Sequence, residues 1–325
     1  MNDRVQNSIF RQPRAIDLLQ QYRPGVTFFG TPRATLLTYG VKAAVPLCAV
    51  QNLAAAATAL LGEAEREGDL WPILIGAIPF GADAPARLFI PQQVLIGLGV
   101  KEQRGAIQPA PKPDSKPAPG AVQMRPTPDQ YRHNVSRALS KIDAAAIEKV
   151  VLSRSLSLQG QVDLPALLQG LVGRNPLAYS FAIDLVDALP DAPAERRTLI
   201  GASPELLLAR YGREVVSHPL AGSIPRSADA QEDRRRADAL LCSHKDLREH
   251  ALVVDAVAAT LRPYCSTLSV PSAPTLLATP TMWHLGTEVR GELADPSVTS
   301  LQLALALHPT PAVCGHPTTA AKEFI

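Results

Sequence analysis

The sequence predicts an α+β protein whose antiparallel sheets pack together and are flanked by helices. Strand-like runs follow one another closely and are joined by short turns, as antiparallel pairing allows. Segments with helical periodicity lie between these runs. The sequence contains neither GxGxxG nor GxxxxGK[ST], which argues against nucleotide binding of the Rossmann or P-loop type.

The chain before residue 106 combines both kinds of element. Residues 26–41 are predicted to form two short strands around a Thr-Pro turn, because β-branched and aromatic residues flank that turn. Residues 52–66 are rich in alanine and favour a helix. The apolar run 70–80 is typical of a strand.

A proline-rich segment then divides the chain. Proline makes up 30 of the 325 residues, about 9% against a usual ~5%. Seven of these prolines lie from Pro109 to Pro128, where they leave few backbone donors for a hydrogen-bonded ladder. We therefore predict an exposed linker over residues 106–128, which separates an N-terminal part, 1–105, from a second part, 129–325.

The second part begins with a predicted helix and strand. Apolar residues at helical spacing indicate the helix, and these are Tyr131, Val135, Leu139 and Ile142. Residues 148–158 are predicted to form one strand, in which alternate side chains face opposite sides. Its apolar side carries Val150, Leu152, Leu156 and Leu158. Lys149 belongs to the other, polar side.

Further strands are predicted over residues 178–186, 198–209 and 213–221, the second of which is interrupted by Pro204. A long helix is predicted over residues 245–262. Its buried side is expected to consist of Leu247, Ala251, Val254, Val257 and Leu261.

Composition and charge exclude several classes of function. Lys and Arg number 32 against 30 Asp and Glu, a formal charge of +2 that provides no electrostatic footprint for nucleic acid or an anionic membrane. The four cysteines are far apart and form no CxxC, so neither a disulfide framework nor a zinc site is indicated. No apolar run approaches the roughly 18 residues of a spanning helix. We therefore expect a soluble cytoplasmic protein.

Six short runs in order resemble the signature blocks of chorismate-utilising enzymes, and most closely those of siderophore-type isochorismate synthases. The runs are KVVLSR (149–154), GASPELLL (201–208), PLAGSIPR (219–226), KDLREH (245–250), MWHLGTEVRG (282–291) and HPTPAVCG (308–315). Two earlier runs, TFFGTPRATLLTYGV (27–41) and IGAIPF (75–80), are similar to the same branch. The resemblance implies the chorismate-binding enzyme fold and a monomeric isomerase that needs Mg²⁺.

The implied reaction converts chorismate to isochorismate by adding water at C2 and removing the C4 hydroxyl. The implied product feeds the biosynthesis of a siderophore through 2,3-dihydroxybenzoate or salicylate. Neither nucleic acid nor a membrane is an expected partner.

The resemblance also implies an acid and a base. Lys149 would be the general base that activates water, which requires a pKa lowered by burial or by nearby positive charge. From the pattern alone, its alternative is a solvated lysine on a polar strand face. Glu205 would be the general acid, and the apolar run that follows it favours a raised pKa. Its alternative is a carboxylate at a hairpin turn.

The remaining implied site residues bind metal or substrate. Glu249 would be a Mg²⁺ ligand, although Asp246 and Glu249 also fit the spacing of a helix capping box. Gly222 and Ser223 would contact substrate, or form an ordinary turn. His284 would lie in the pocket, or be a histidine satisfied within the core.

Two departures from the family pattern qualify these expectations. The chain stops where family members continue with a second Mg²⁺-binding glutamate and residues that hold the substrate carboxylate. This predicts an incomplete C-terminal part of the fold and a poor or inactive enzyme, with a non-catalytic remnant as one alternative. Gly286 is atypical of isochorismate synthases and keeps salicylate synthase as another.

The histidines at 244 and 250 lack the spacing of a metal pair on one helix face.

Overall fold

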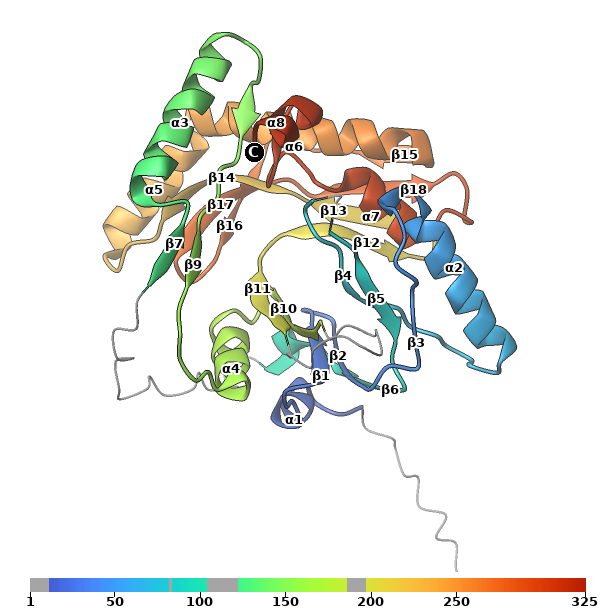
Figure 1. Cartoon of the computed structure of the whole chain (residues 1–325). Coiled ribbons are helices and arrows are strands. Elements are labelled where there is room, and N and C mark those ends of the chain that lie inside the picture. The colour runs from blue at the N-terminus through green and yellow to red at the C-terminus, as the bar shows by residue number, and fades with distance from the viewer. Residues whose placement is uncertain (1–11, 82–83, 104–121, 186–196) are drawn as a thin grey trace, which may run out of the picture.

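Two layers of antiparallel sheet face each other, and helices cover the outer side of each layer (Figure 1). The computed structural model describes residues 12–81, 84–103, 122–185 and 197–325. All strand pairs in these residues are antiparallel, which confirms the predicted α+β class. Within them, no helix is long and apolar enough to cross a membrane.

One layer is a five-stranded sheet. In spatial order its strands are β11 (Thr198–Ser203), β10 (Tyr179–Asp184), β1 (Val26–Gly30), β2 (Ala34–Tyr39) and β6 (Gln93–Leu98). Two helices pack on it, α1 (Ala15–Gln20) and α4 (Leu164–Arg174). Buried side chains from both helices meet Phe28, Leu37 and Ala182 of the strands in one hydrophobic cluster.

The facing layer contains two sheets. The four-stranded sheet has the order β12 (Leu206–Tyr211), β13 (Glu214–His218), β18 (Val289–Leu293) and β15 (Cys265–Ser269). The three-stranded sheet has the order β14 (Leu220–Pro225), β17 (Met282–Gly286) and β16 (Thr275–Ala278).

Helices α5 (Ala230–Leu241), α6 (His244–Leu261) and α7 (Ser300–Leu307) cover this layer. The cluster beneath them joins valines and leucines of α6 and α7 to Val215, Val289 and Leu293 of the sheet. Hydroxyl and carboxylate caps begin these helices: Asp229 for α5, Ser243 for α6 and Thr299 for α7.

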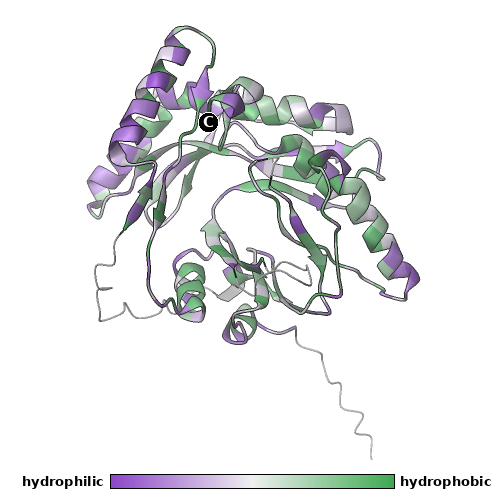
Figure 2. Ribbon diagram, viewed as in Figure 1, coloured by the Kyte–Doolittle hydropathy of each residue, from purple (hydrophilic) through white to green (hydrophobic). Residues whose placement is uncertain are grey.

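Short elements complete the described residues. Three small sheets consist of β3 (Ala43–Ala44), β5 (Arg87–Ile90) and β4 (Ile75–Ala77); β8 (Lys149–Val150) and β19 (Gly315–His316); and β7 (Gln123–Arg125) and β9 (Ser155–Ser157). The remaining helices are α2 (Val50–Arg66), α3 (Pro128–Asp143), α8 (Thr318–Phe324) and two 3₁₀ turns, Val100–Gln103 and Arg262–Tyr264. Figure 2 shows that the outer helix α3 is largely hydrophilic, whereas the strands between the helical layers carry much of the hydrophobic sequence.

The predicted helices over 52–66 and 245–262 are confirmed, as is the helix around Tyr131. The predicted buried sides are only partly right. On α6, Ala251 is exposed and His250, Val253 and Ala258 are buried instead. Leu139 of α3 is 55% exposed. Helical periodicity places residues on a face, but the neighbouring sheet decides where the buried face is centred.

Four strand predictions were wrong in extent. The run 213–221 divides at Pro219 into β13 and β14, which belong to different sheets. Residues 148–158 form two short strands, β8 and β9, which pair with different partners. Of the run 70–80, only β4 is strand. The run 198–209 divides at Pro204 into β11 and β12, which belong to opposite layers. Glu205 therefore follows a crossover between sheets and does not sit in a hairpin turn.

The linker predicted over 106–128 lies mostly outside the described residues, since the structure describes it only from Val122 onward. Gln123–Arg125 form the exposed strand β7. The five-stranded sheet takes β1, β2 and β6 from before this segment and β10 and β11 from after it. The division into parts 1–105 and 129–325 remains a prediction about the sequence.

A cluster around Asp233 ties α5 to β14 and β17. The Asp233 carboxylate accepts hydrogen bonds from the Arg226 guanidinium (2.9 Å), the Ser227 N–H (2.9 Å) and the Trp283 indole N–H (3.0 Å). Arg226 also stacks on the Trp283 ring, 4.3 Å from its centroid. These donors hold the pKa of Asp233 well below its ordinary value.

We predict that Asp233→Asn lowers the melting temperature, because the amide offers one acceptor where several donors converge. The control is Asp238→Asn, at an exposed position of the same helix. Since the folded pKa of Asp233 is depressed, its contribution is fully present above the unfolded value of 3.8 and declines as pH falls below it. The difference in melting temperature between wild type and Asp233→Asn should therefore shrink on acidification, and a constant difference would contradict this assignment.

Candidate active site

Lys149 is a buried lysine, so the alternative of a solvated lysine on a polar strand face is wrong. β8 is only two residues long and pairs with β19, so that the side chain enters the interior beneath α6 and the loop after α7. Lys149 is 8% exposed. Its Nζ donates to the Pro311 carbonyl at 2.5 Å and lies 3.6 Å from Oε1 of Glu249.

Burial lowers the pKa of Lys149, because the interior disfavours the charged ammonium. The carboxylates of Glu249 and Glu205 oppose this shift without cancelling it. A lysine in this environment releases its proton more readily than one in water, as a general base must.

Glu205 lies half-buried at the start of β12, directly after the crossover. Its backbone N–H donates to Ser203 Oγ at 3.2 Å, and its Oε1 accepts from the Leu220 N–H at 3.3 Å. Burial raises the pKa of Glu205, while the Leu220 N–H and the Lys149 ammonium act against the rise. The carboxyl group therefore retains its proton to higher pH than an exposed glutamate.

Glu249 lies on α6 and takes no part in capping. The cap is Ser243, whose Oγ accepts from the Asp246 N–H at 3.3 Å, so a capping box formed by Asp246 and Glu249 is excluded. The Glu249 carboxylate lies between two ammonium groups, 3.6 Å from Lys149 Nζ and 3.1 Å from Lys245 Nζ.

A metal ion would find one suitable ligand here. The part of the chain that the structure describes contains no group of three or more His, Cys, Asp and Glu side chains that could hold an ion. Glu249 presents a single hard oxygen ligand that is partly accessible. Such a carboxylate suits Mg²⁺, which commonly binds one or two protein carboxylates and completes its shell with water and substrate oxygens.

Gly222 forms a bulge in β14 that touches α6. The pairing of β14 with β17 shifts register between Leu220 and Ser223. Gly222 has φ +80°, and a Cβ there would lie 3.1 Å from both Asp246 Cβ and Leu285 Cδ1. Only glycine combines this backbone conformation with so close an approach.

Ser223 and His284 are register partners on β14 and β17. The Ser223 hydroxyl and His284 Nδ1 are 2.7 Å apart. Burial lowers the pKa of His284, which favours the neutral imidazole. The pair therefore offers a neutral hydroxyl and imidazole beside the bulge.

His250 is the residue whose importance the sequence analysis missed. It is 2% exposed, with Nδ1 3.1 Å from the Ala221 carbonyl and Nε2 2.7 Å from Thr287 Oγ1. The signal lay in helical spacing, because position 250 shares a face with the buried Val253, Val254 and Val257.

Gly286, the residue that is atypical of isochorismate synthases, is closely packed. A Cβ at this position would lie 2.8 Å from His218 Nε2 and from Leu220 Cδ2. A side chain at this position would therefore require His218 or Leu220 to move.

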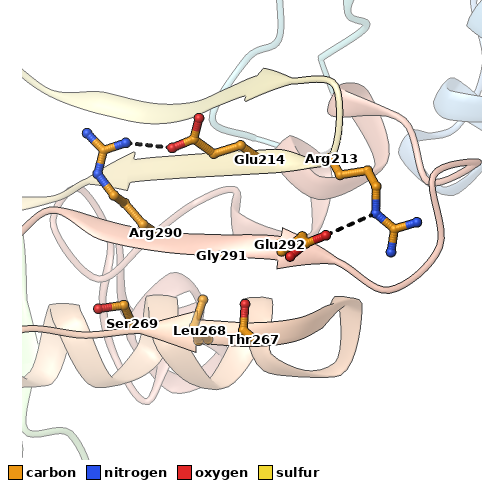
Figure 3. A pocket seen from close by; sticks show the side chains of 8 residues that line it. All are labelled: Arg213, Glu214, Thr267, Leu268, Ser269, Arg290, Gly291 and Glu292. Carbon is orange, nitrogen blue, oxygen red and sulfur yellow. Dashed lines mark hydrogen bonds and ion pairs between the residues drawn. The ribbon is translucent and has the colours of Figure 1, made fainter.

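One hollow on the surface lies elsewhere. Figure 3 shows it on the face of β13, β18 and β15 opposite to α6, with a volume of about 510 Å³. Two ion pairs line it, Arg290 with Glu214 at 2.7 Å and Arg213 with Glu292 at 3.4 Å. It includes none of the residues implied in chemistry.

The structure thus brings the implied residues together in two groups that β14 connects. Lys149, Glu205 and Glu249 form one electrostatic cluster. Ser223 and His284 form a hydrogen-bonded pair next to Gly222.

Comparison with known proteins identifies the family of this chain. Residues 96–325 match the family described as chorismate binding enzyme. The isochorismate synthase DhbC of Bacillus subtilis strain 168 is 43% identical over 329 residues, covering 99% of this chain and 80% of that protein. The vibriobactin-specific isochorismate synthase of Vibrio cholerae is 38% identical, covering 92% and 72%.

Solved structures have the same fold. A Bacillus anthracis protein assigned as a 2,3-dihydroxybenzoate-specific isochorismate synthase, DhbC, is 40% identical with a TM-score of 0.85, covering 96% of this chain and 79% of that one. The menaquinone-specific isochorismate synthase MenF of Escherichia coli has a TM-score of 0.74 at 20% identity, covering 94% and 72%, a likeness of fold alone. Because the family match extends over more than half of the sequence, and relatives of this identity cover most of it, the chain belongs to the chorismate-binding enzyme family.

Proposed function

We propose that this chain is an isochorismate synthase, which converts chorismate to isochorismate. The observation that carries the proposal is the pairing of a buried lysine of lowered pKa with a half-buried glutamate of raised pKa. Base and acid come from β8 and from the start of β12, so they can serve two positions of one ring. The isochorismate synthases among the relatives support the same reaction.

In this proposal, neutral Lys149 takes a proton from the water that adds at C2. Glu205 gives its proton to the C4 hydroxyl, which leaves as water while the two ring double bonds shift. One water enters and one departs, so the ring keeps its composition. In the reverse direction the two residues exchange roles.

Substrate would lie against the β14 bulge. Because Gly222 has no side chain, a substrate could approach the backbone of the bulge closely. Ser223 and His284 present neutral polar groups beside it. These groups would orient the ring without competing for protons with Lys149 and Glu205.

We propose that Glu249 is one ligand of a Mg²⁺ ion. When bound, Mg²⁺ supplies positive charge that neutralises the ring carboxylate of the substrate. Two observations support this: a carboxylate is a ligand that Mg²⁺ prefers, and Glu249 lies 3.6 Å from Lys149, which places it next to the proposed base.

The product would feed the biosynthesis of a siderophore. The support is that one relative is named vibriobactin-specific and another 2,3-dihydroxybenzoate-specific. The alternative, salicylate synthase, also releases pyruvate. Supplying purified isochorismate and assaying pyruvate separates the two. A chain that binds chorismate without turnover under any Mg²⁺ concentration would instead be a non-catalytic member of the family.

We predict that Lys149→Met lowers turnover of chorismate by ~10²–10⁴, the range of a lost general base. Methionine keeps most of the buried stem, so the melting temperature should stay near that of wild type. Lys141→Met, at an exposed position of α3, is the control. Turnover similar to wild type in Lys149→Met would remove Lys149 from the chemistry.

Glu205→Gln should keep chorismate binding and slow the chemical step, because an amide preserves shape but delivers no proton. Single-turnover kinetics and equilibrium binding measure the two effects separately. Since the pKa of Glu205 is raised above its usual 4.5, the wild-type rate should fall as pH rises through that raised value. The residual rate of Glu205→Gln should lack this dependence. Loss of binding with an unchanged chemical step would make Glu205 a residue that positions substrate.

Glu249→Gln should weaken Mg²⁺ binding, because the amide removes the negative charge from the ligand. Titration calorimetry with Mg²⁺ in the presence of chorismate measures the affinity. Asp255→Asn, an exposed position on the same helix, is the matched control. Equal affinity in the two variants would place the metal elsewhere.

A further inference from the structure

The buried imidazole of His250 joins three segments of the candidate site. It lies on α6, one residue after Glu249. Its Nδ1 is 3.1 Å from the Ala221 carbonyl of the β14 bulge. Its Nε2 is 2.7 Å from the hydroxyl of Thr287, which follows β17.

The partners determine the tautomer. A carbonyl oxygen only accepts hydrogen bonds, so Nδ1 carries the proton and donates to Ala221. Nε2 then accepts from the Thr287 hydroxyl, which is itself buried. Both ring nitrogens of His250 are satisfied, and loss of either partner would leave a buried polar group without a hydrogen bond.

The Ala221 carbonyl is the point at which α6 holds the bulge. Ala221 precedes Gly222, where an added Cβ would lie 3.1 Å from Asp246 Cβ of α6. Thr287 is held in turn, because its N–H donates to the Pro219 carbonyl at 3.4 Å. The imidazole therefore connects the helix directly to Ala221, within the irregular stretch of β14, and through Thr287 to Pro219, which precedes that strand.

We infer that His250 is a positioning residue. Its imidazole holds the bulge at Ala221 and Gly222 against α6, beside Glu249 of the same helix. The inference rests on the proposed function for its effect on chorismate, although the structural effect stands by itself. His250 contacts no reacting atom in this role. It acts through the backbone of β14.

Two substitutions separate the two hydrogen bonds. Asparagine places its amide N–H near the position of Nδ1, so His250→Asn can still donate to Ala221. Glutamine reaches the position of Nε2, so His250→Gln keeps a bond to Thr287 but loses the one to Ala221. Thr287→Val removes the hydroxyl and nearly preserves the volume of the side chain. His133→Gln, at an exposed histidine of α3, is the control.

The first readout is amide hydrogen exchange followed by mass spectrometry. Peptides that contain residues 219–226 should exchange faster in His250→Gln than in His250→Asn, while peptides from the five-stranded sheet stay at the wild-type rate in both. Equal exchange at 219–226 in wild type, His250→Asn and His250→Gln would overturn the inference. Equally fast exchange in the two variants would also overturn it, because the ring would then only fill space.

The second readout is steady-state kinetics with chorismate. His250→Gln should raise KM by about tenfold, the factor that corresponds to a hydrogen bond of ~1.4 kcal/mol, with a smaller change in kcat. His250→Asn should recover most of the wild-type KM, and Thr287→Val should lie between the two. An equal KM in His250→Asn and His250→Gln would overturn the positioning role. If wild type shows no turnover, the proposed function fails, and hydrogen exchange still decides whether His250 holds the bulge.

Discussion

The close contact between the β14 bulge and the first turns of α6 is the constraint on which the site depends. Gly222 makes it possible, because its φ of +80° is strained for other residues and a Cβ there would lie only 3.1 Å from Asp246 and Leu285. On one side of the bulge, the Leu220 N–H holds the Glu205 carboxylate. On the other, Ser223 pairs with His284. One irregular strand thus sets the positions of groups from three other segments.

The burial of Lys149 shows how such a site costs stability. An ammonium in the interior loses its hydration, and one carbonyl and one carboxylate at 3.6 Å replace it incompletely. This imbalance is the reason that its pKa is lowered. The hydrophobic clusters around α1, α4, α6 and α7 provide the stability that permits it.

Burial shifts the pKa values of Lys149 and Glu205 in opposite directions. Desolvation disfavours whichever form is charged, so it lowers the pKa of a lysine and raises that of a glutamate in one environment. Lys149 and Glu205 are driven toward their neutral forms together. A neutral lysine and a neutral carboxyl group are the forms that accept and deliver protons, so this shift is the one that the proposed roles of base and acid require.

The sequence by itself determined the α+β class, the positions of α2, α3 and α6 and the family, and it named the six residues that we propose as the site. Those features depend on local periodicity and on short motifs, which are written in consecutive residues. Only the tertiary structure decided that Lys149 is buried, that Pro204 marks a crossover between layers, that Ala251 faces outward and that His250 holds the bulge. Each of these depends on partners far along the chain: the hydrogen-bond acceptor of Lys149 is 162 positions away, and the two hydrogen-bond partners of His250 are 29 and 37 positions away. Burial is a property of such distant partners, because a side chain leaves water only when another segment covers it.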